Sequence, residues 1–347
     1  MTTLATPPGP ADARRARTPE RKLRRQFLDR LIVSASGGAG LLMLLLLCVM
    51  DVVLFHGAWP AMQRFGLHFL FSTNWDPQND TFTALPAIWG TLFSSFFALL
   101  IAVPMSIGCA VFLVRIAPKW LVNPVAFLVE VLAAIPSITY GLWGMAVLVP
   151  LLQKYVIPII SRTAGQWNWW LVSKNEWGVE TYFPANIFAT GGAGTGILAA
   201  SIILAVMIIP IITAVTRDVL NAVPKDLEQG AYGLGATWWQ ATKVVLSFAR
   251  SGIFGAVVLG LARAIGETMA VAMVIGNETD FTGTIVGPSN TMTSLLANKL
   301  REIPQGGMPV YHDSLIYIAL ILLVLTLTVN FTARFLVERT TRKLARR

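Results

Sequence analysis

The sequence predicts an all-α membrane protein with six transmembrane helices. Of its 347 residues, 55% are hydrophobic and only 13% are charged, whereas a soluble domain carries about 25% charged residues. A helix needs about 20 largely apolar residues to cross the hydrocarbon core of a bilayer. Six stretches meet this criterion, at residues 32–55, 87–114, 124–150, 195–216, 253–277 and 314–337.

The segment that precedes the first span, residues 1–31, is rich in Pro, Ala and Arg. We expect a mostly disordered basic tail that contacts the anionic headgroups of membrane lipids. The apolar run 32–55 is longer than that of a signal peptide, and no small-residue cleavage pattern follows it. We therefore expect a retained transmembrane helix.

The distribution of Lys and Arg predicts the orientation of the spans. Of the 27 basic residues, twenty lie in the N-terminal tail, the second and fourth loops and the C-terminal tail, and six lie in the other three loops. The positive-inside rule then places both termini in the cytoplasm. The net charge of +9 thereby follows from membrane topology, and we expect no nucleic-acid partner.

Two of the loops have distinctive compositions. The external loop 151–194 carries four tryptophans, which are typical either of an interfacial aromatic belt or of a docking surface for an extracytoplasmic partner. In the cytoplasmic loop 217–250, Pro224 can begin a short helix and Gly235 can end it in a left-handed conformation. A second short helix over 236–247 would complete a hairpin, and an amphipathic connector lying on the membrane is the alternative.

Arg263 and Glu267 are the only charged residues in the stretch 251–277. Positions four apart share one face of a helix, and an arginine at mid-membrane costs about 2.5–3.5 kcal/mol on insertion scales. The pair should therefore face the interior of the bundle or an aqueous path. It is either a structural ion pair, or a site where Arg263 holds a passing oxyanion while Glu267 limits how tightly it holds.

Glu130 is the other prominent acidic residue within a predicted span. Pro136, six residues further on, would disrupt the local helix and free a backbone carbonyl. We expect Glu130 to have a structural or gating role first, and we keep it as a candidate for the substrate path.

Several motifs resemble those of PstC-type permeases, which belong to the binding-protein-dependent transport inner-membrane component family of bacterial ABC importers. They are IPSITYGLWG (135–144), GLGATWW (233–239) and LARAIGETMAVAMVIGN (261–277). The resemblance covers 85–340 and implies a type I ABC importer permease fold that moves phosphate. It implies a substrate path that includes Arg263, Glu267, Thr268 and Glu130. The sister permease usually continues this last motif with Ala-Pro-Leu, whereas this chain continues with Met-Ala-Val.

The cytoplasmic loop also resembles the coupling loop of ABC importer permeases. Gln229, Gly230, Ala231 and Gly235 match its first part, with glutamine in place of the usual glutamate, and Ser247 stands where proline is usual. The resemblance implies a PstA-like sister permease, two PstB-like ATPase subunits that grip this loop, and a PstS-like extracytoplasmic phosphate-binding protein.

The sequence lacks the glycine-rich Lys-Ser/Thr loop that binds nucleotide phosphates, and its three histidines form no ligand cluster. We therefore expect no cofactor, no metal and no catalysis, with ATP hydrolysed by separate subunits. The alternatives are a sulfate or molybdate importer permease, an ion-coupled secondary carrier, and an intramembrane enzyme acting on a lipid phosphate. The carrier should show an internal repeat, and the enzyme a cluster of nucleophile and base; we find neither in the sequence.

Overall fold

The computed structural model describes residues 19–73, 75–163, 173–174, 180–181, 188, 194–279, 281, 283–302 and 309–344. The chain forms two compact units, Met1–His56 and Gly57–Arg347, each considered by itself below. Six helical stretches are long and apolar enough to cross a membrane, which confirms the predicted all-α class. They are Arg30–Phe65, Leu85–Ile116, Ser137–Thr163, Ile197–Asn221, Trp238–Ile265 and Pro309–Phe335.

The first unit consists of most of helix α1 (Pro19–Phe65), whose last residues belong to the second unit. Residues 19–31, which we expected to be disordered, are helical in the structure. The physical reason is the Arg, Lys, Leu and Gln content of this stretch, since these residues have high helix propensity. The remainder of the expected disordered tail, residues 1–18, lies outside the described part of the chain.

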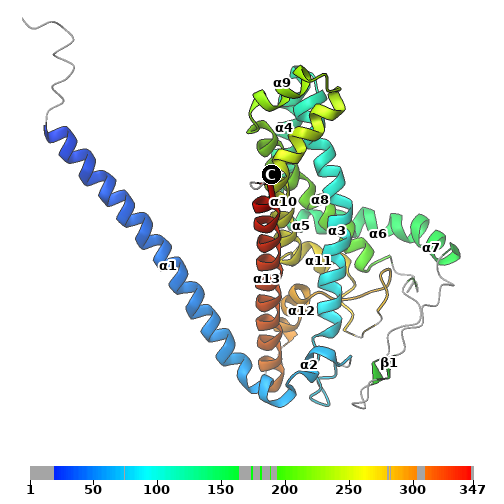
Figure 1. The fold of residues 1–347 in the computed structure, drawn as a ribbon. Helices are drawn as coiled ribbons and strands as arrows, with labels where there is room; N and C mark the ends of the chain where they lie inside the picture. Colours follow the sequence, from blue (N-terminus) through cyan, green and yellow to red (C-terminus); the bar gives the residue numbers. More distant parts are fainter. Residues whose placement is uncertain are drawn as a thin grey trace, which may run out of the picture. The chain divides into compact units, whose positions relative to one another are not determined.

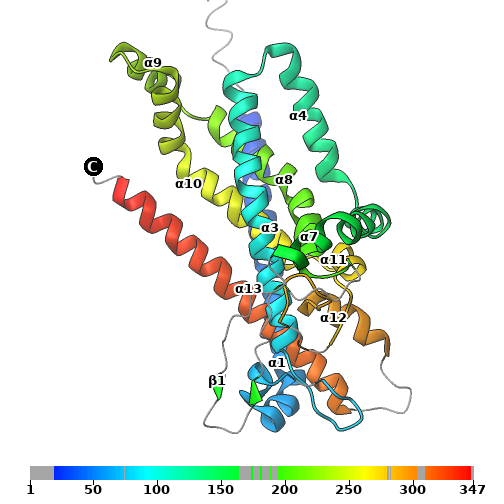
Figure 2. The ribbon, with the colours of Figure 1, turned by 90° about the vertical axis from the view of Figure 1, so that its right-hand side faces the viewer.

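The core of the second unit is built from α3 (Leu85–Val111), α8 (Ile197–Asn221) and α10 (Trp238–Ile265), which lie side by side (Figures 1 and 2). Small residues allow this close packing. At Gly260, a β-carbon would lie 2.7 Å from the δ-carbon of Ile212, so a larger residue there would force that side chain to move, and glycine allows α10 to approach α8 closely. Helix α13 (Pro309–Leu344) packs against α10.

A second, aromatic core lies at the opposite end of this unit from the short helix α9 (Lys225–Gly233) (Figure 1). Phe69, on α2 (His68–Phe71), stacks on Tyr317 of α13 with ring centroids 4.6 Å apart. Trp75, Phe82 and Tyr311 add edge-to-face contacts around it. This cluster joins the beginning of α13 to the segment before α3.

The third span differs from its predicted range of 124–150. Helix α4 (Lys119–Ala134) ends just before Pro136, and a new helical stretch begins at Ser137. The span is Ser137–Thr163, assembled from α5 (Ser137–Trp143), α6 (Val149–Leu151), α7 (Ile157–Thr163) and the π-helical turns η2 (Gly144–Leu148) and η3 (Leu152–Val156). Because Pro136 cannot donate a backbone hydrogen bond, it separates α4 from the span.

The fifth span also differs from its predicted range of 253–277. Helix α10 already begins at Trp238, where Thr237 and Gln240 form a reciprocal capping box. The separate helix expected over 236–247 is therefore the first part of α10. At its other end α10 stops at Ile265, and Gly266 occupies the C-cap.

The chain between α10 and α13 contains two short helices, α11 (Met269–Val274) and α12 (Met292–Lys299), followed by the 3-10 turn η4 (Leu300–Glu302). The stretch between α11 and α12 is mostly extended, and Gly276 and Ser289 form an isolated parallel bridge. Several polar residues here are buried, namely Asn290, Thr291, Thr293 and Ser294. Their hydroxyl and amide groups bond to one another or to nearby backbone, as buried polar groups require.

The remaining elements are the π-helical turn η1 (Phe112–Ile116) after α3 and two short antiparallel strands, β1 (Ser173–Lys174) and β2 (Glu180–Thr181). Both strands fall in the predicted loop 151–194, in which helix continues as far as Thr163. The four tryptophans of this loop lie outside the described residues.

Candidate functional site

Arg263 and Glu267 meet at a break in the membrane helix. Arg263 lies in the last turn of α10, whereas Glu267 lies in the link between α10 and α11. The expectation that both belong to one continuous helix was therefore wrong, because the helix ends at Ile265. The two side chains nevertheless pair, with Nη2 of Arg263 3.5 Å from Oε2 of Glu267.

The environment of Glu267 fixes its carboxylate in place. Its side chain is only 3% exposed, and Oε1 accepts a hydrogen bond of 3.3 Å from the backbone N–H of Ala270. The backbone carbonyl of Glu267 accepts a hydrogen bond of 2.7 Å from the Thr293 hydroxyl. Glu267 is thus held by its carboxylate to α11 and by its backbone carbonyl to α12, away from solvent.

The guanidinium of Arg263 has the opposite character, because its side chain is 49% exposed. A guanidinium carries five N–H donors, and the pairing with Glu267 engages only one of its nitrogens. The other donors remain available to a planar, doubly accepting group such as a carboxylate or a phosphate. The arrangement presents one tethered cation on the open face of α10.

Thr268 lies beside this pair, at the N-cap of α11. Its hydroxyl donates a long hydrogen bond of 3.5 Å to the carbonyl of Gly266, and the side chain is half-buried. Thr293, which supports Glu267 from α12, was not among the residues singled out from the sequence. The run of small polar residues TGTIVGPSNTMTS at 282–294 is the signal that could have drawn attention to it.

Glu130 does not join the Arg263 site. It lies on α4, where Oε1 is 3.3 Å from Nη2 of Arg217 on α8, and Arg217 also pairs with its neighbour Asp218 at 3.2 Å. Glu130, Arg217 and Asp218 line an open cavity of about 400 Å³ between α4 and α8. Because α4 is a separate helix, Glu130 lies outside the six candidate spans.

The predicted hairpin at 222–248 is present in the structure. Pro224 precedes α9, and Gly235 has a φ of +80°, the left-handed conformation that favours glycine. The N–H of Ala236 bonds to the carbonyl of Ala231 at 3.1 Å and closes the turn. Gln229, Gly230 and Gly235 are exposed, Ala231 is half-buried, and Leu234, Trp238 and Trp239 present exposed apolar side chains.

An ion pair that the sequence did not predict joins this hairpin to η1, the turn that follows α3. Arg115, whose side chain is 9% exposed, pairs with Glu228 of α9. Its Nη2 also donates to the hydroxyl of Thr242 on α10 at 3.3 Å. Both partners, Glu228 and Thr242, lie more than 100 positions from Arg115 in the chain, so no local pattern could have indicated the contact.

Six apolar spans, a charged pair at a helix break and an exposed hairpin at one end of the bundle are features of a membrane permease. The family model for binding-protein-dependent transport system inner membrane components matches residues 102–346, and this chain belongs to that family. It is therefore a multi-pass inner membrane component with the expected type I importer permease fold.

The individual relatives are named for phosphate. The chain is 39% identical over 314 residues to the phosphate transport system permease protein PstC of Haemophilus influenzae, covering 90% of this chain and 94% of that protein. It is 40% identical over 313 residues to PstC of Mesorhizobium japonicum, covering 90% of each. Among solved structures, a chain of the MetNI methionine ABC transporter aligns at 18% identity with a TM-score of 0.47, covering 74% of this chain and 94% of that chain.

Proposed function

We propose that this chain is a non-catalytic permease subunit of an ATP-driven importer that moves inorganic phosphate into the cell. The observation that carries the proposal is the half-exposed guanidinium of Arg263, in the last turn of a membrane span, paired with the buried carboxylate of Glu267 just beyond it. The names of the PstC relatives support phosphate as the cargo. The absence of a nucleotide-binding motif from the sequence supports a separate source of ATP hydrolysis.

The chemistry of the site suits transient binding of an oxyanion. The planar fork of Arg263 matches two phosphate oxygens and keeps its charge at any physiological pH. A permeation site must also release its cargo, and Glu267 weakens the hold of Arg263 by neutralising part of its charge. Since Glu267 is itself buried, its role is to restrain Arg263 rather than to bind the anion directly. The Thr268 hydroxyl adjoins the site and can add a hydrogen bond to the anion.

The exposed face of α10 is the reason for proposing a sister permease. Gly255, Leu259 and Arg263 are exposed and recur every four residues, so they lie on one face of the helix. An aqueous path along this face needs a second wall, since a lipid-facing arginine is costly. A related permease would supply that wall, and an extracytoplasmic binding protein would deliver phosphate to it.

The exposed surface of the hairpin is the reason for proposing a contact with the ATPase subunits. Its exposed apolar side chains, among them Leu234, Trp238 and Trp239, provide anchors of the kind found at protein interfaces. We place this end of the bundle, and both termini, in the cytoplasm on the basis of the positive-inside rule. Closure of two ATPase subunits would push the hairpin and rock the spans between outward and inward access.

The experiment is uptake by the complete complex of both permeases, two ATPases and binding protein, reconstituted in lipid vesicles. We expect ATP-dependent phosphate uptake that arsenate inhibits and sulfate does not. Arg263→Gln should abolish uptake while the complex still assembles, and the matched control Arg64→Gln, an exposed arginine paired with Asp80, should leave uptake unchanged. Phosphate uptake by Arg263→Gln at the wild-type rate and affinity would contradict the proposed path, and equal competition by sulfate would contradict phosphate as the specific cargo.

The proposed role of the hairpin is tested separately with Gly235→Asp. Aspartate is less favourable than glycine at a φ of +80° and adds a negative charge to the contact surface. We expect the ATPase subunits to co-purify poorly with this variant, and uptake to fall accordingly. Normal co-purification together with normal uptake would remove the hairpin from the coupling mechanism.

A further inference from the structure

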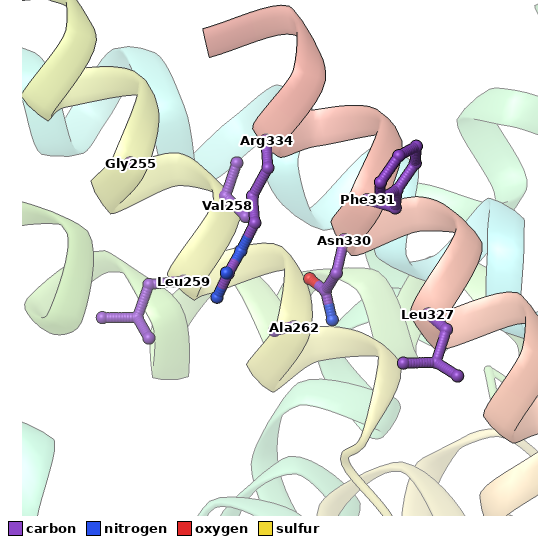
Figure 3. Close-up of a pocket in the computed structure, with 8 residues that line it drawn as sticks. All are labelled: Gly255, Val258, Leu259, Ala262, Leu327, Asn330, Phe331 and Arg334. Atoms are coloured by element: carbon purple, nitrogen blue, oxygen red, sulfur yellow. The ribbon is translucent and has the colours of Figure 1, made fainter. Parts of the chain in front are cut away.

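An open groove of about 830 Å³ runs between α10 and α13 (Figure 3). Its walls are mostly apolar, with Val258 and Leu259 on α10 and Leu327 and Phe331 on α13. Two polar side chains interrupt this lining, Asn330 and Arg334, both on α13. The function proposed above assigns no role to either of them.

The polar ends of Asn330 and Arg334 point into the groove. In Figure 3 the Arg334 guanidinium extends along the groove toward Leu259, and the Asn330 amide is directed toward α10 near Ala262. Arg334 is exposed, and it forms no ion pair with any residue whose side chain the structure describes. A guanidinium beside apolar walls, with an amide donor one helical turn away, is suited to bind an oxyanion.

The groove is continuous with the face of α10 that carries Arg263. Gly255 and Leu259 line the groove, and Arg263 follows them on the same face at the same spacing of four residues. Arg263 lies eight residues beyond Gly255, which corresponds to about 12 Å along the helix axis. An anion that leaves Arg263 toward the end of the bundle that carries the hairpin therefore meets Asn330 and Arg334 next.

We propose that Arg334, assisted by Asn330, is a second oxyanion-binding station on the inward leg of the transport path. The inference rests on the proposed function, because it takes Arg263 as the preceding station. A single site that binds strongly slows release of the anion. A second, weaker site divides the release into two steps, each with a smaller free-energy barrier. The occupant is the transported phosphate rather than a lipid, because the groove that holds the two polar groups is also lined by Gly255 and Leu259, which share a face of α10 with Arg263.

The test uses the complete reconstituted complex in vesicles of neutral phosphatidylcholine. Arg334→Gln should lower the maximal rate of phosphate uptake about tenfold, the size of effect expected for loss of a hydrogen bond to a charged group. The half-saturating concentration of phosphate-loaded binding protein and the ATPase activity that it stimulates should stay unchanged, so less phosphate enters per ATP hydrolysed. Arg334→Lys should restore most of the rate, and Asn330→Ala should lower it about threefold, since a neutral hydrogen bond contributes less.

The control is Lys119→Gln, which removes an exposed positive charge at the start of α4 without touching the groove; it should transport at the wild-type rate. Uptake by Arg334→Gln within twofold of wild type would overturn the inference. So would a parallel loss of stimulated ATPase activity, which would mean a structural role, or a deficit seen only when anionic phosphatidylglycerol is added, which would mean a lipid site. Wild-type complex that transports no phosphate would instead refute the proposed function, and the two failures are thereby distinguished.

Discussion

Glu267 is buried whereas Arg263 is half-exposed. We therefore expect neutralising the two residues to lower the free energy of unfolding by unequal amounts. Arg263→Gln leaves a buried carboxylate with only the N–H of Ala270 as a side-chain partner, and we expect a loss of about 2–3 kcal/mol in stability. Glu267→Gln keeps an acceptor for that N–H and frees a guanidinium that water can solvate. We expect this change to cost about 1 kcal/mol.

The energy of the pair itself follows from its geometry. Two unit charges 3.5 Å apart attract by roughly 5 kcal/mol at an effective dielectric constant of 20 and by about 1 kcal/mol in water. Burial of Glu267 favours the larger figure, whereas exposure of Arg263 and desolvation of the carboxylate reduce it. We therefore expect a coupling energy of about 1–2 kcal/mol, between the values for exposed and fully buried pairs.

The assay is a double-mutant cycle on the assembled complex, measured as thermal or denaturant-induced unfolding of wild type, the two single variants and Arg263→Gln/Glu267→Gln. The double variant should be about 1–2 kcal/mol more stable than the sum of the single losses predicts. Equal costs for the two single variants, or strict additivity, would refute the argument that a buried carboxylate depends on a more exposed guanidinium.

Two further predictions concern contacts away from this pair. Arg115→Gln should break the link from η1 to Glu228 of the hairpin and lower ATP-driven uptake several-fold, because an ion pair with a nearly buried arginine loses one partner. Exchanging the two residues should restore part of the uptake, and no restoration would mean that the charge pair is not the link. Hydrogen bonds, chiefly from the Asn79 side chain, hold the pKa of Asp76 below its ordinary value of 3.8. The ionised carboxylate therefore stabilises its loop above that pH and loses this effect as the pH falls through the lower folded value. Asp76→Asn should accelerate proteolysis of the loop at neutral pH, by a factor that shrinks in acid; a factor independent of pH would contradict this reasoning.

The parts of the fold that the sequence predicted depend on local and compositional effects. Six spans follow from the free energy of transferring apolar residues to the bilayer, and the hairpin follows from the positions of Pro224 and Gly235. The helix boundaries at Ile265 and Ser137 were missed. At Ile265 an apolar run continues past the end of the helix, and hydropathy alone does not register such an ending.

The charged residues themselves were also evident from the sequence, since an arginine and a glutamate within an apolar span stand out at once. Their burial and hydrogen bonds, however, depend on how distant segments of the chain pack together. Glu267 is buried because α11 and α12 enclose it, and its carbonyl is held by Thr293, 26 residues away. The partner of Glu130 could not be read from the sequence either, because Arg217 lies 87 residues further on.

By itself, the sequence indicated six apolar stretches long enough to cross a membrane, one arginine and one glutamate close together in such a stretch, and a cytoplasmic hairpin. These properties follow from transfer free energies and from backbone conformations set by a few residues. Only the tertiary structure decided which of the paired charges is buried and which is open. It also decided that Arg115, in the turn after α3, joins that turn to the hairpin, and that Arg334 lies in a groove lined by residues from the face of α10 that carries Arg263. Such contacts join residues far apart in the chain, and their energies depend on how the helices pack.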